Sequence, residues 1–357
     1  MNALHIQVPE NFVARNCHQL WFQIEDIQNS EARVELPALL FDMTKLKAFD
    51  AHGANLLVLV PHLLQARGHN VKVLLPKLDK VLFLMDQVGI LREFASRFSI
   101  EKGWGFTFDR LQDRKREILG GLHEYHFFKY AYPSMRFQAL SLLDPKWVGG
   151  RFTGNGRKFM RETEDWARDL TRGIPNSLRT IESGRQAAQC LSELVLNVFE
   201  HSTETTACAT VQIFGDKHRG GEKKLLLAVS DVGVGIHATL RAEYNRYRRL
   251  CLDQSDLPRD PEDVELLKYA VQPGVSRRGP WFGGMGLHYA SAFPTAFTLS
   301  SGNSSLHVTG RPRREREGII VLEEGVECPD VWVRDMKGEV SRRYVSGTHA
   351  IAVWSVR

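Results

Sequence analysis

A carboxylate and a carboxamide stand four residues apart in the segment SELVLNVFEH, at residues 192–201. They are Glu193 and Asn197, and the apolar residues between them favour an amphipathic helix. On such a helix both side chains project from one face, with Cβ atoms about 6 Å apart. At a phosphate group the carboxylate can orient or deprotonate a nucleophile, and the amide oxygen can ligate Mg²⁺. Taken alone, the pair also fits an ordinary polar helix face.

A second polar position comes directly after an expected apolar strand, in SDVGVGI at residues 230–236. Asp231 stands at the end of that strand, and Gly233 and Gly235 follow it. An aspartate there can accept a hydrogen bond from the amino group of adenine, while glycine lets the backbone pass close to the base. A glycine-rich turn without a ligand explains the same letters equally well.

Two further motifs come later in the chain. The sequence GGMGLH, which contains Gly284 and Gly286, leads into an expected helical stretch at 287–292. Glycines before a helix expose backbone N–H groups to a triphosphate, and the helix dipole favours the negative charge. A flexible loop without a ligand is the alternative. Thr348, in the tripeptide SGT, opens the last expected strand, where its hydroxyl can support an aspartate–adenine contact through water.

In this order, the four motifs resemble the ATPase domain shared by gyrase, the heat-shock chaperone, histidine kinases and mismatch-repair proteins. The resemblance covers about residues 175–357, and it implies a Bergerat-type fold with ATP and Mg²⁺ as ligands. By position it assigns these roles: Glu193 as general base, Asn197 as Mg²⁺ ligand, Asp231 as reader of adenine, Gly233 and Gly235 as walls of its pocket, Gly284 and Gly286 as phosphate binders, and Thr348 as support for the base.

The same resemblance implies an ATP lid at about residues 237–282. Within it, PGVSR at 273–277 resembles the end of the lid in bacterial members of the family. Arg277 or Arg278 would reach the γ-phosphate there, and a solvent-exposed role for either arginine is an equal alternative.

Glu193 indicates the branch of the family. Typical sensor histidine kinases lack a glutamate at this position, because their histidine nucleophile needs no such base. The hydrolases and the anti-sigma factor serine kinases have one, since they activate water or a serine hydroxyl. The run from Glu193 to His201 most resembles the anti-sigma factor serine kinases.

A histidine kinase would also need a phosphoacceptor histidine ahead of the ATPase domain. The nearest candidate, His123 in LHEYH, lacks the rest of that motif, so we interpret it as a surface or packing residue. His123 and His126 have no further ligand pair nearby, so no metal site is expected from them.

The N-terminal part of the chain predicts alternating strands and helices. Apolar runs at 38–43 and 70–75 indicate strands, and the patterns at 53–67 and 78–94 indicate helices. Short connections between them predict an α/β domain with neighbouring parallel strands.

This region, about residues 30–100, resembles the STAS domain of anti-sigma factor antagonists. The likeness lies in LFDMTK at 40–45, in FDAHG at 49–53 and in the order of elements. Antagonists carry a phosphorylatable Ser or Thr after the aspartate, whereas Asp50 here is followed by Ala51. We therefore expect a docking platform that does not accept phosphate.

The C-terminal part predicts an α+β sandwich, with a mostly antiparallel sheet covered by helices on one face. A long helix from about residue 177 or 185 to His201 precedes a hairpin of strands. The expected strands lie at 209–214, 224–229, 296–300, 318–322 and 348–354. We place an N-terminal STAS-like domain at 1–105, a connector at 106–155 and the ATP-binding domain at 156–357.

Composition limits the class of protein. The 357 residues carry a net charge of +5 without a charged tail, and the strongest basic cluster, at 241–249, is typical of a solvated helix face, so no nucleic-acid partner is expected. Five scattered cysteines without a CxxC pair argue against a disulfide framework or a zinc knuckle. With no signal peptide and no apolar run long enough to span a bilayer, we expect a cytoplasmic protein.

Two functions remain open at this point. The first is an ATP-dependent serine/threonine protein kinase of partner-switching type that phosphorylates a partner protein in trans. The partner would be another STAS-like protein or a sigma-factor-type regulator, and a homodimer is also allowed. The second is an ATP-gated binding module with slow or absent hydrolysis.

Overall fold

The protein is described by a computed structural model, which contains two units. The first comprises Met1–Ala139 with Thr210–Phe214, and the second comprises Leu140–Ala209 with Gly215–Arg357. The structure describes residues 4–29, 38–97, 99–100, 135–141, 147–148, 151–152, 181–201, 206–215, 223–241, 244, 260–271, 286–292, 294–309, 319–321, 327–329 and 336–356. The candidate His123 lies outside these ranges.

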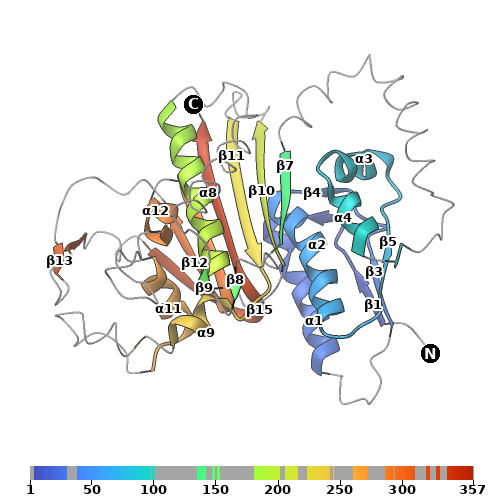
Figure 1. The fold of residues 1–357 in the computed structure, drawn as a ribbon, viewed down its shortest axis with the longest axis horizontal. Helices are drawn as coiled ribbons and strands as arrows, with labels where there is room; N and C mark the ends of the chain where they lie inside the picture. Colours follow the sequence, from blue (N-terminus) through green and yellow to red (C-terminus); the bar gives the residue numbers. More distant parts are fainter. Residues whose placement is uncertain are drawn as a thin grey trace. The chain divides into compact units, whose positions relative to one another are not determined.

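The first unit contains a four-stranded parallel sheet in the order β1-β3-β5-β6 (Figure 1). Its strands are β1 (Leu4–Gln7), β3 (Leu39–Asp42), β5 (Val71–Leu74) and β6 (Ser99–Ile100), and every neighbouring pair is parallel. The helices are α1 (His18–Asn29), α2 (Ala51–Ala66), α3 (Asp79–Gln87) and α4 (Ile90–Arg97). The parallel α/β region predicted for the N-terminal part is therefore confirmed.

Helix α2 forms the apolar centre of this unit. Thirteen of its 16 residues are buried, including the polar His52 and Asn55. It begins two residues earlier than expected because Asp50 caps it, with Oδ1 accepting from Gly53 N at 2.9 Å. A Cβ at Gly53 would lie 2.0 Å from Phe12 O, so only glycine allows this close approach of the two backbones.

The helix expected at 78–94 is two helices, and that expectation was wrong in its continuity. Gly89 separates α3 from α4 with a φ of 88°, a left-handed conformation that ends a helix and that glycine adopts without strain. The apolar stripe continues on both sides of the break, which is why the periodicity alone did not reveal it. Strand β1 and helix α1 were not predicted.

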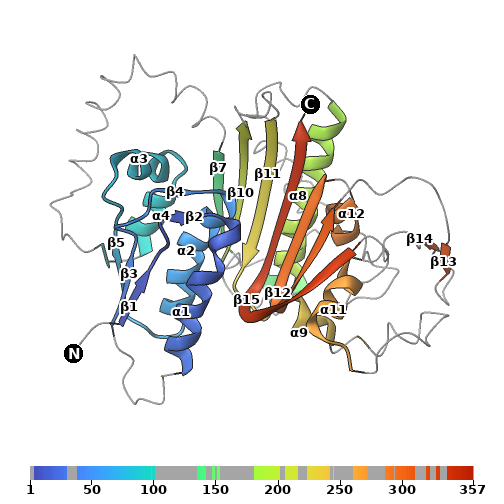
Figure 2. The ribbon, with the colours of Figure 1, turned by 180° about the vertical axis from the view of Figure 1, so that it is seen from behind.

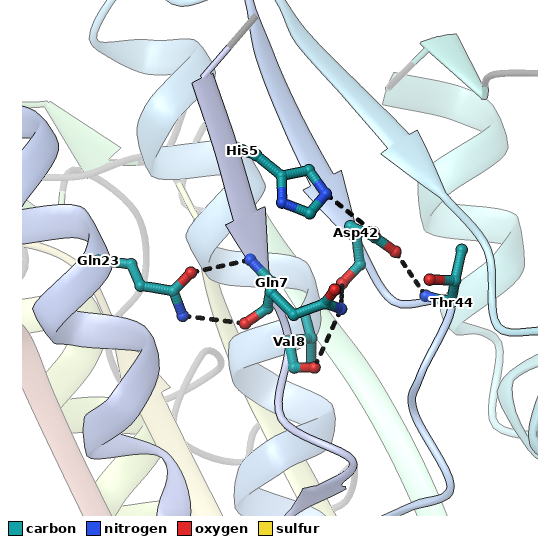
Figure 3. A network of polar contacts seen from close by, with 6 residues as sticks. All are labelled: His5, Gln7, Val8, Gln23, Asp42 and Thr44. Carbon is teal, nitrogen blue, oxygen red and sulfur yellow. Dashed lines mark hydrogen bonds and ion pairs between the residues drawn. The ribbon is translucent and has the colours of Figure 1, made fainter.

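A polar network joins β1, β3 and α1 (Figure 3). His5 Nε2 lies 2.8 Å from Asp42 Oδ2, and Thr44 N donates to Asp42 Oδ1 at 2.7 Å. Gln7 N donates to Gln23 Oε1, and Gln23 Nε2 donates to Gln7 O. Burial alone would raise the pKa of Asp42, but the hydrogen bonds from Thr44 and His5 outweigh it and hold this pKa below its usual value.

Short pairings complete the N-terminal and central parts of the chain. Strand β2 (Asn11–Phe12) pairs in parallel with β4 (Ala48–Phe49), and a 3₁₀ turn at Ala14–Asn16 follows β2. Strand β8 (Trp147–Val148) pairs antiparallel with β9 (Arg151–Phe152).

A five-stranded sheet runs in the order β12-β15-β11-β10-β7. Its strands are β12 (Ala296–Thr309), β15 (Met336–Val356), β11 (Lys223–Asp231), β10 (Thr206–Gly215) and β7 (Met135–Ser141). Strand β15 is antiparallel to both β11 and β12. Helices lie on one face of this sheet (Figure 2), namely α8 (Ile181–His201), α9 (Gly235–Arg241), α11 (Asp263–Ala270) and α12 (Gly286–Ala292). The predicted antiparallel sheet packed with helices is confirmed.

One expected strand of this sheet lies elsewhere. Strand β13 (Ile319–Val321) pairs with β14 (Glu327–Pro329) in a separate two-stranded sheet, so placing 318–322 in the main sheet was wrong. The place beside β15 is taken by β12, which runs on through the polar sequence SSGNSS. That sequence lacks apolar alternation, so the length of β12 could not be inferred from it. Among the helices that the structure describes, none is long and apolar enough to cross a membrane.

Candidate functional site

The carboxyl end of β11 carries a buried aspartate. Asp231 is the last residue of the strand and only 4% exposed, and its Oδ1 accepts a hydrogen bond from Gly233 N at 2.8 Å. The chain then turns and starts α9 at Gly235, whose φ of 80° lies in the left-handed region. The aspartate is thus held in a tight turn between a strand and a helix, as its position in the sequence predicted.

Strand β15 braces this turn from outside. Ser346 Oγ donates to Val232 O at 3.2 Å, and Thr348 Oγ1 accepts from Ile236 N at 3.2 Å. A Cβ on Gly347, with a φ of 82°, would lie 2.1 Å from Asp231 O, so β15 reaches the turn only because this residue is glycine. The support that the sequence suggested for Thr348 therefore includes a direct bond to the backbone of the turn.

Helix α8 carries the carboxylate and the carboxamide. Its buried apolar face packs against β11, α9 and α12, and Glu193 and Asn197 are partly exposed. The Nδ2 atom of Asn197 is buried, and among the residues that the structure describes it has no hydrogen-bond partner. A buried amide without a partner costs free energy of about 1–3 kcal/mol, so this group is suited to a ligand.

Helix α12 is fixed to α8 and to the end of α11. Cys190 Sγ lies 3.6 Å from Ala290 O, and His288 Nδ1 lies 3.2 Å from Val271 O. Burial, together with the nearby Glu193 carboxylate, raises the pKa of the Cys190 thiol, which therefore stays protonated and can donate.

The structure brings most of the predicted site residues to one region of the second unit. Asp231, Gly233, Gly235 and Thr348 belong to a single braced turn. Glu193 and Asn197 lie on α8, which packs against the strand before that turn and the helix after it. Gly286 is the first residue of α12, which packs on α8. Gly284, Arg277 and Arg278 lie outside the described residues.

Part of the segment expected to form the lid belongs to the folded body instead. Helix α11 packs against β12, β15 and α9, and it buries Val264, Leu266, Leu267 and Ala270. An apolar helix face packed on a sheet does not open as a lid without exposing that face. The expected boundaries at 237–282 were therefore too wide.

Sequence reasoning missed a second layer of residues around the turn. His237 Nδ1 lies 3.0 Å from Ser301 Oγ, and Ser301 Oγ donates to Gly347 O at 2.8 Å. Asp263 accepts from Arg241 Nη2 at 2.8 Å and from Asn303 N at 3.0 Å. One signal was present in the sequence: each of the paired strands β12 and β15 contains a Ser-Gly step, and these steps meet beside the turn.

Comparison with known proteins adds no family assignment. A scan of protein-family models and a search of curated proteins each gave no match to this chain.

Proposed function

We propose that the second unit binds Mg²⁺-ATP and that the protein is a cytoplasmic regulator of partner-switching type, resembling the anti-sigma factor serine/threonine kinases. The observation that carries the proposal is the turn after β11. A buried aspartate accepts there from its own Gly233 in a turn that β15 braces, and α8 packs against the strand before the turn and the helix after it. In this proposal the second unit has the Bergerat-type fold and the first is STAS-like.

The residues present suit both ligands. Glu193, Asn197 and Asp231 offer carboxylate and carboxamide oxygens, which can ligate Mg²⁺ and can accept a hydrogen bond from the adenine amino group. The buried nitrogen of the Asn197 amide has no hydrogen-bond partner within the described part of the chain. Rotation of the amide by 180° exchanges nitrogen and oxygen, so the same place can present an oxygen to a cation.

Each residue then has one task. Asp231 would accept the hydrogen bond of the adenine amino group, while Gly233 and Thr348 hold the turn that orients it. Asn197 would hold the metal, and Glu193 would take the proton of the attacking hydroxyl. Bound Mg²⁺-ATP supplies the phosphoryl group, which leaves ADP and joins the oxygen of the partner's serine or threonine.

The first unit is expected to dock a partner and not to accept phosphate. Ala51 begins α2, is fully buried, and donates its backbone N–H to Gln212 Oε1 at 3.0 Å. It stands where the related antagonists carry their hydroxyl. A methyl group without a hydroxyl cannot be phosphorylated, so the substrate would be a separate protein, such as another STAS-like protein. The same feature also suits the second candidate, an ATP-gated binding module, which needs no acceptor at all.

One experiment distinguishes the two candidates. The full-length protein is incubated with γ-labelled ATP and Mg²⁺ beside STAS-like proteins, and both labelled protein and free phosphate are measured. A kinase labels a partner, and a gated module binds ATP without labelling one. Absence of ATP binding in calorimetry would contradict both candidates.

The Glu193 variants sharpen the test. Glu193→Ala should keep ATP affinity within about threefold and lower turnover roughly 100-fold, because the proton acceptor is lost while the ligands of the nucleotide remain. Glu193→Gln keeps the shape of the side chain and should show the same loss. Equal losses of affinity and turnover would instead indicate a role in holding the metal.

A further inference from the structure

Three glycines in the left-handed region meet beside the Asp231 turn. They are Gly235, Gly302 and Gly347, with φ angles of 80°, 62° and 82°. A Cβ at Gly235 would lie 2.4 Å from Ser301 Oγ, and one at Gly302 would lie 2.8 Å from the Cγ atom of His237. The room left by these missing side chains is thus filled by a serine hydroxyl and an imidazole ring.

The hydrogen bonds in this cluster fix the direction of each proton. Gly347 O can only accept, so Ser301 must give its single hydroxyl proton to that carbonyl, at 2.8 Å. The Ser301 oxygen is then an acceptor toward His237 Nδ1, at 3.0 Å. His237 therefore carries a proton on Nδ1, and an ordered relay runs from the imidazole through the hydroxyl to the backbone of β15.

The surroundings keep His237 neutral near pH 7. Burial lowers the pKa of His237, Arg241 lowers it further, and Asp263 opposes them. Asp263 is itself engaged by Arg241 and by Asn303 N. The neutral imidazole with its proton on Nδ1 is a single tautomer, and it is the one that donates to the Ser301 oxygen.

We propose that His237 is a positioning residue that sets the base selectivity of the nucleotide site. Gly347 packs directly on the Asp231 carbonyl, and its own carbonyl is held by the Ser301 hydroxyl, which accepts from His237. The relay thereby fixes how far β15 stands from the aspartate that would read adenine. The inference rests on the proposed ATP site and adds the element that makes it prefer adenine. Contacts to the triphosphate would lie elsewhere, at Gly286 of α12 and through the Mg²⁺ proposed at Asn197 of α8, so only the base contact depends on the relay.

The test compares ATP with GTP on the full-length protein, by calorimetry in the presence of Mg²⁺. His237→Ala should weaken ATP about tenfold and leave GTP within about twofold, so the preference for ATP falls. His237→Asn places an amide N–H near the position of Nδ1 and should restore the preference to within about threefold of wild type. His237→Gln extends its amide toward the position of Nε2 and should behave like His237→Ala.

This set separates the relay from simple packing. Volume alone favours Gln over Asn as a replacement for His, so a packing role predicts the opposite order and would overturn the inference. His307 is the matched control, because its Nδ1 lies 3.1 Å from the Thr298 hydroxyl on the same strand, β12, as Ser301. His307→Ala should leave the ATP-to-GTP ratio unchanged.

A second variant tests the relay without changing the imidazole. Ser301→Ala should reduce the ATP-to-GTP ratio as His237→Ala does, and the double variant should add little, because both changes break one chain of contacts. Additive effects, or an unchanged ratio in Ser301→Ala, would overturn the inference while leaving the ATP site intact. If wild type binds neither nucleotide, the proposed function itself fails.

Discussion

Two aspartates, the partly buried Asp50 in one unit and the buried Asp231 in the other, stand shortly before a helix and differ in what holds the chain around them. Asp50 holds its own surroundings, because one oxygen caps α2 at Gly53 and the other accepts from Ala14 N at 2.9 Å. Asp231 also accepts from its own turn, but Ser346 and Thr348 of β15 brace that turn independently. The Asp50 carboxylate accepts the bonds that hold the chain around it, so the fold depends on it. The Asp231 turn has further bonds from β15 that do not involve the carboxylate, so the shape of the turn depends less on it.

The largest effect is expected on stability at Asp50. Asp50→Ala leaves two backbone N–H groups without their acceptor, so the free energy of unfolding should fall by about 2–4 kcal/mol. Urea denaturation measures this loss, and the ATP affinity of the folded protein should stay near that of wild type. A variant of normal stability would show that the carboxylate is not needed for the fold.

Asp231 should show the reverse pattern. Asp231→Asn puts an amide donor where adenine requires an acceptor, so ATP affinity should fall about 10- to 100-fold. The bonds from β15 remain, and the melting temperature without nucleotide should change little. If the variant binds ATP normally in calorimetry, the adenine contact has been assigned to the wrong residue.

The sequence predicted the elements of the fold better than the contacts of the candidate site. Spacing was sufficient for α8, for β3 and for the strand that ends at Asp231, because each carries a clear apolar period. It failed at Gly89, where only a backbone angle breaks a continuous stripe. It also failed at the contact of His237 with Ser301, because these residues lie 64 positions apart and meet only where α9 packs on β12.

The dependence of stability on pH gives a smaller effect and extends the comparison to Asp42. Its pKa is lower in the folded protein than in the unfolded chain, so its contribution is present above the unfolded pKa and is lost as pH falls through the folded one. Asp42→Asn should cost about 1 kcal/mol at pH 7 and progressively less in acid. Denaturation at pH 7, 5 and 3 measures this difference. The stability contribution of Asp50 should change with pH in the opposite direction, because burial raises its pKa. A loss of stability in Asp42→Asn that is the same at all three pH values would contradict the lowered pKa of Asp42.

The smallest effect is expected at Ala51, where a new hydroxyl should not become phosphorylated. Ala51→Ser introduces a hydroxyl at the start of α2, but the position is fully buried and its N–H is bonded to Gln212. Mass spectrometry after incubation with Mg²⁺-ATP should find no phosphate on residues 45–60 of either the variant or the wild type. A stoichiometric phosphosite there would show that this helix start becomes accessible and would remove the docking-platform interpretation.

The bond between Thr348 and Ile236 has a consequence for synthesis of the protein. The two residues lie 112 positions apart, so the brace is absent until residue 348 has been translated. At about 5–20 residues per second, the finished turn waits about 6–22 s for it. During that interval the turn that carries Asp231 lacks its bond to β15, so the proposed base site is incomplete. Under the proposed function, the ability to bind ATP would therefore arise late in translation. A stalled chain ending before residue 346 would contain Glu193, Asn197 and Asp231 and yet would not bind ATP.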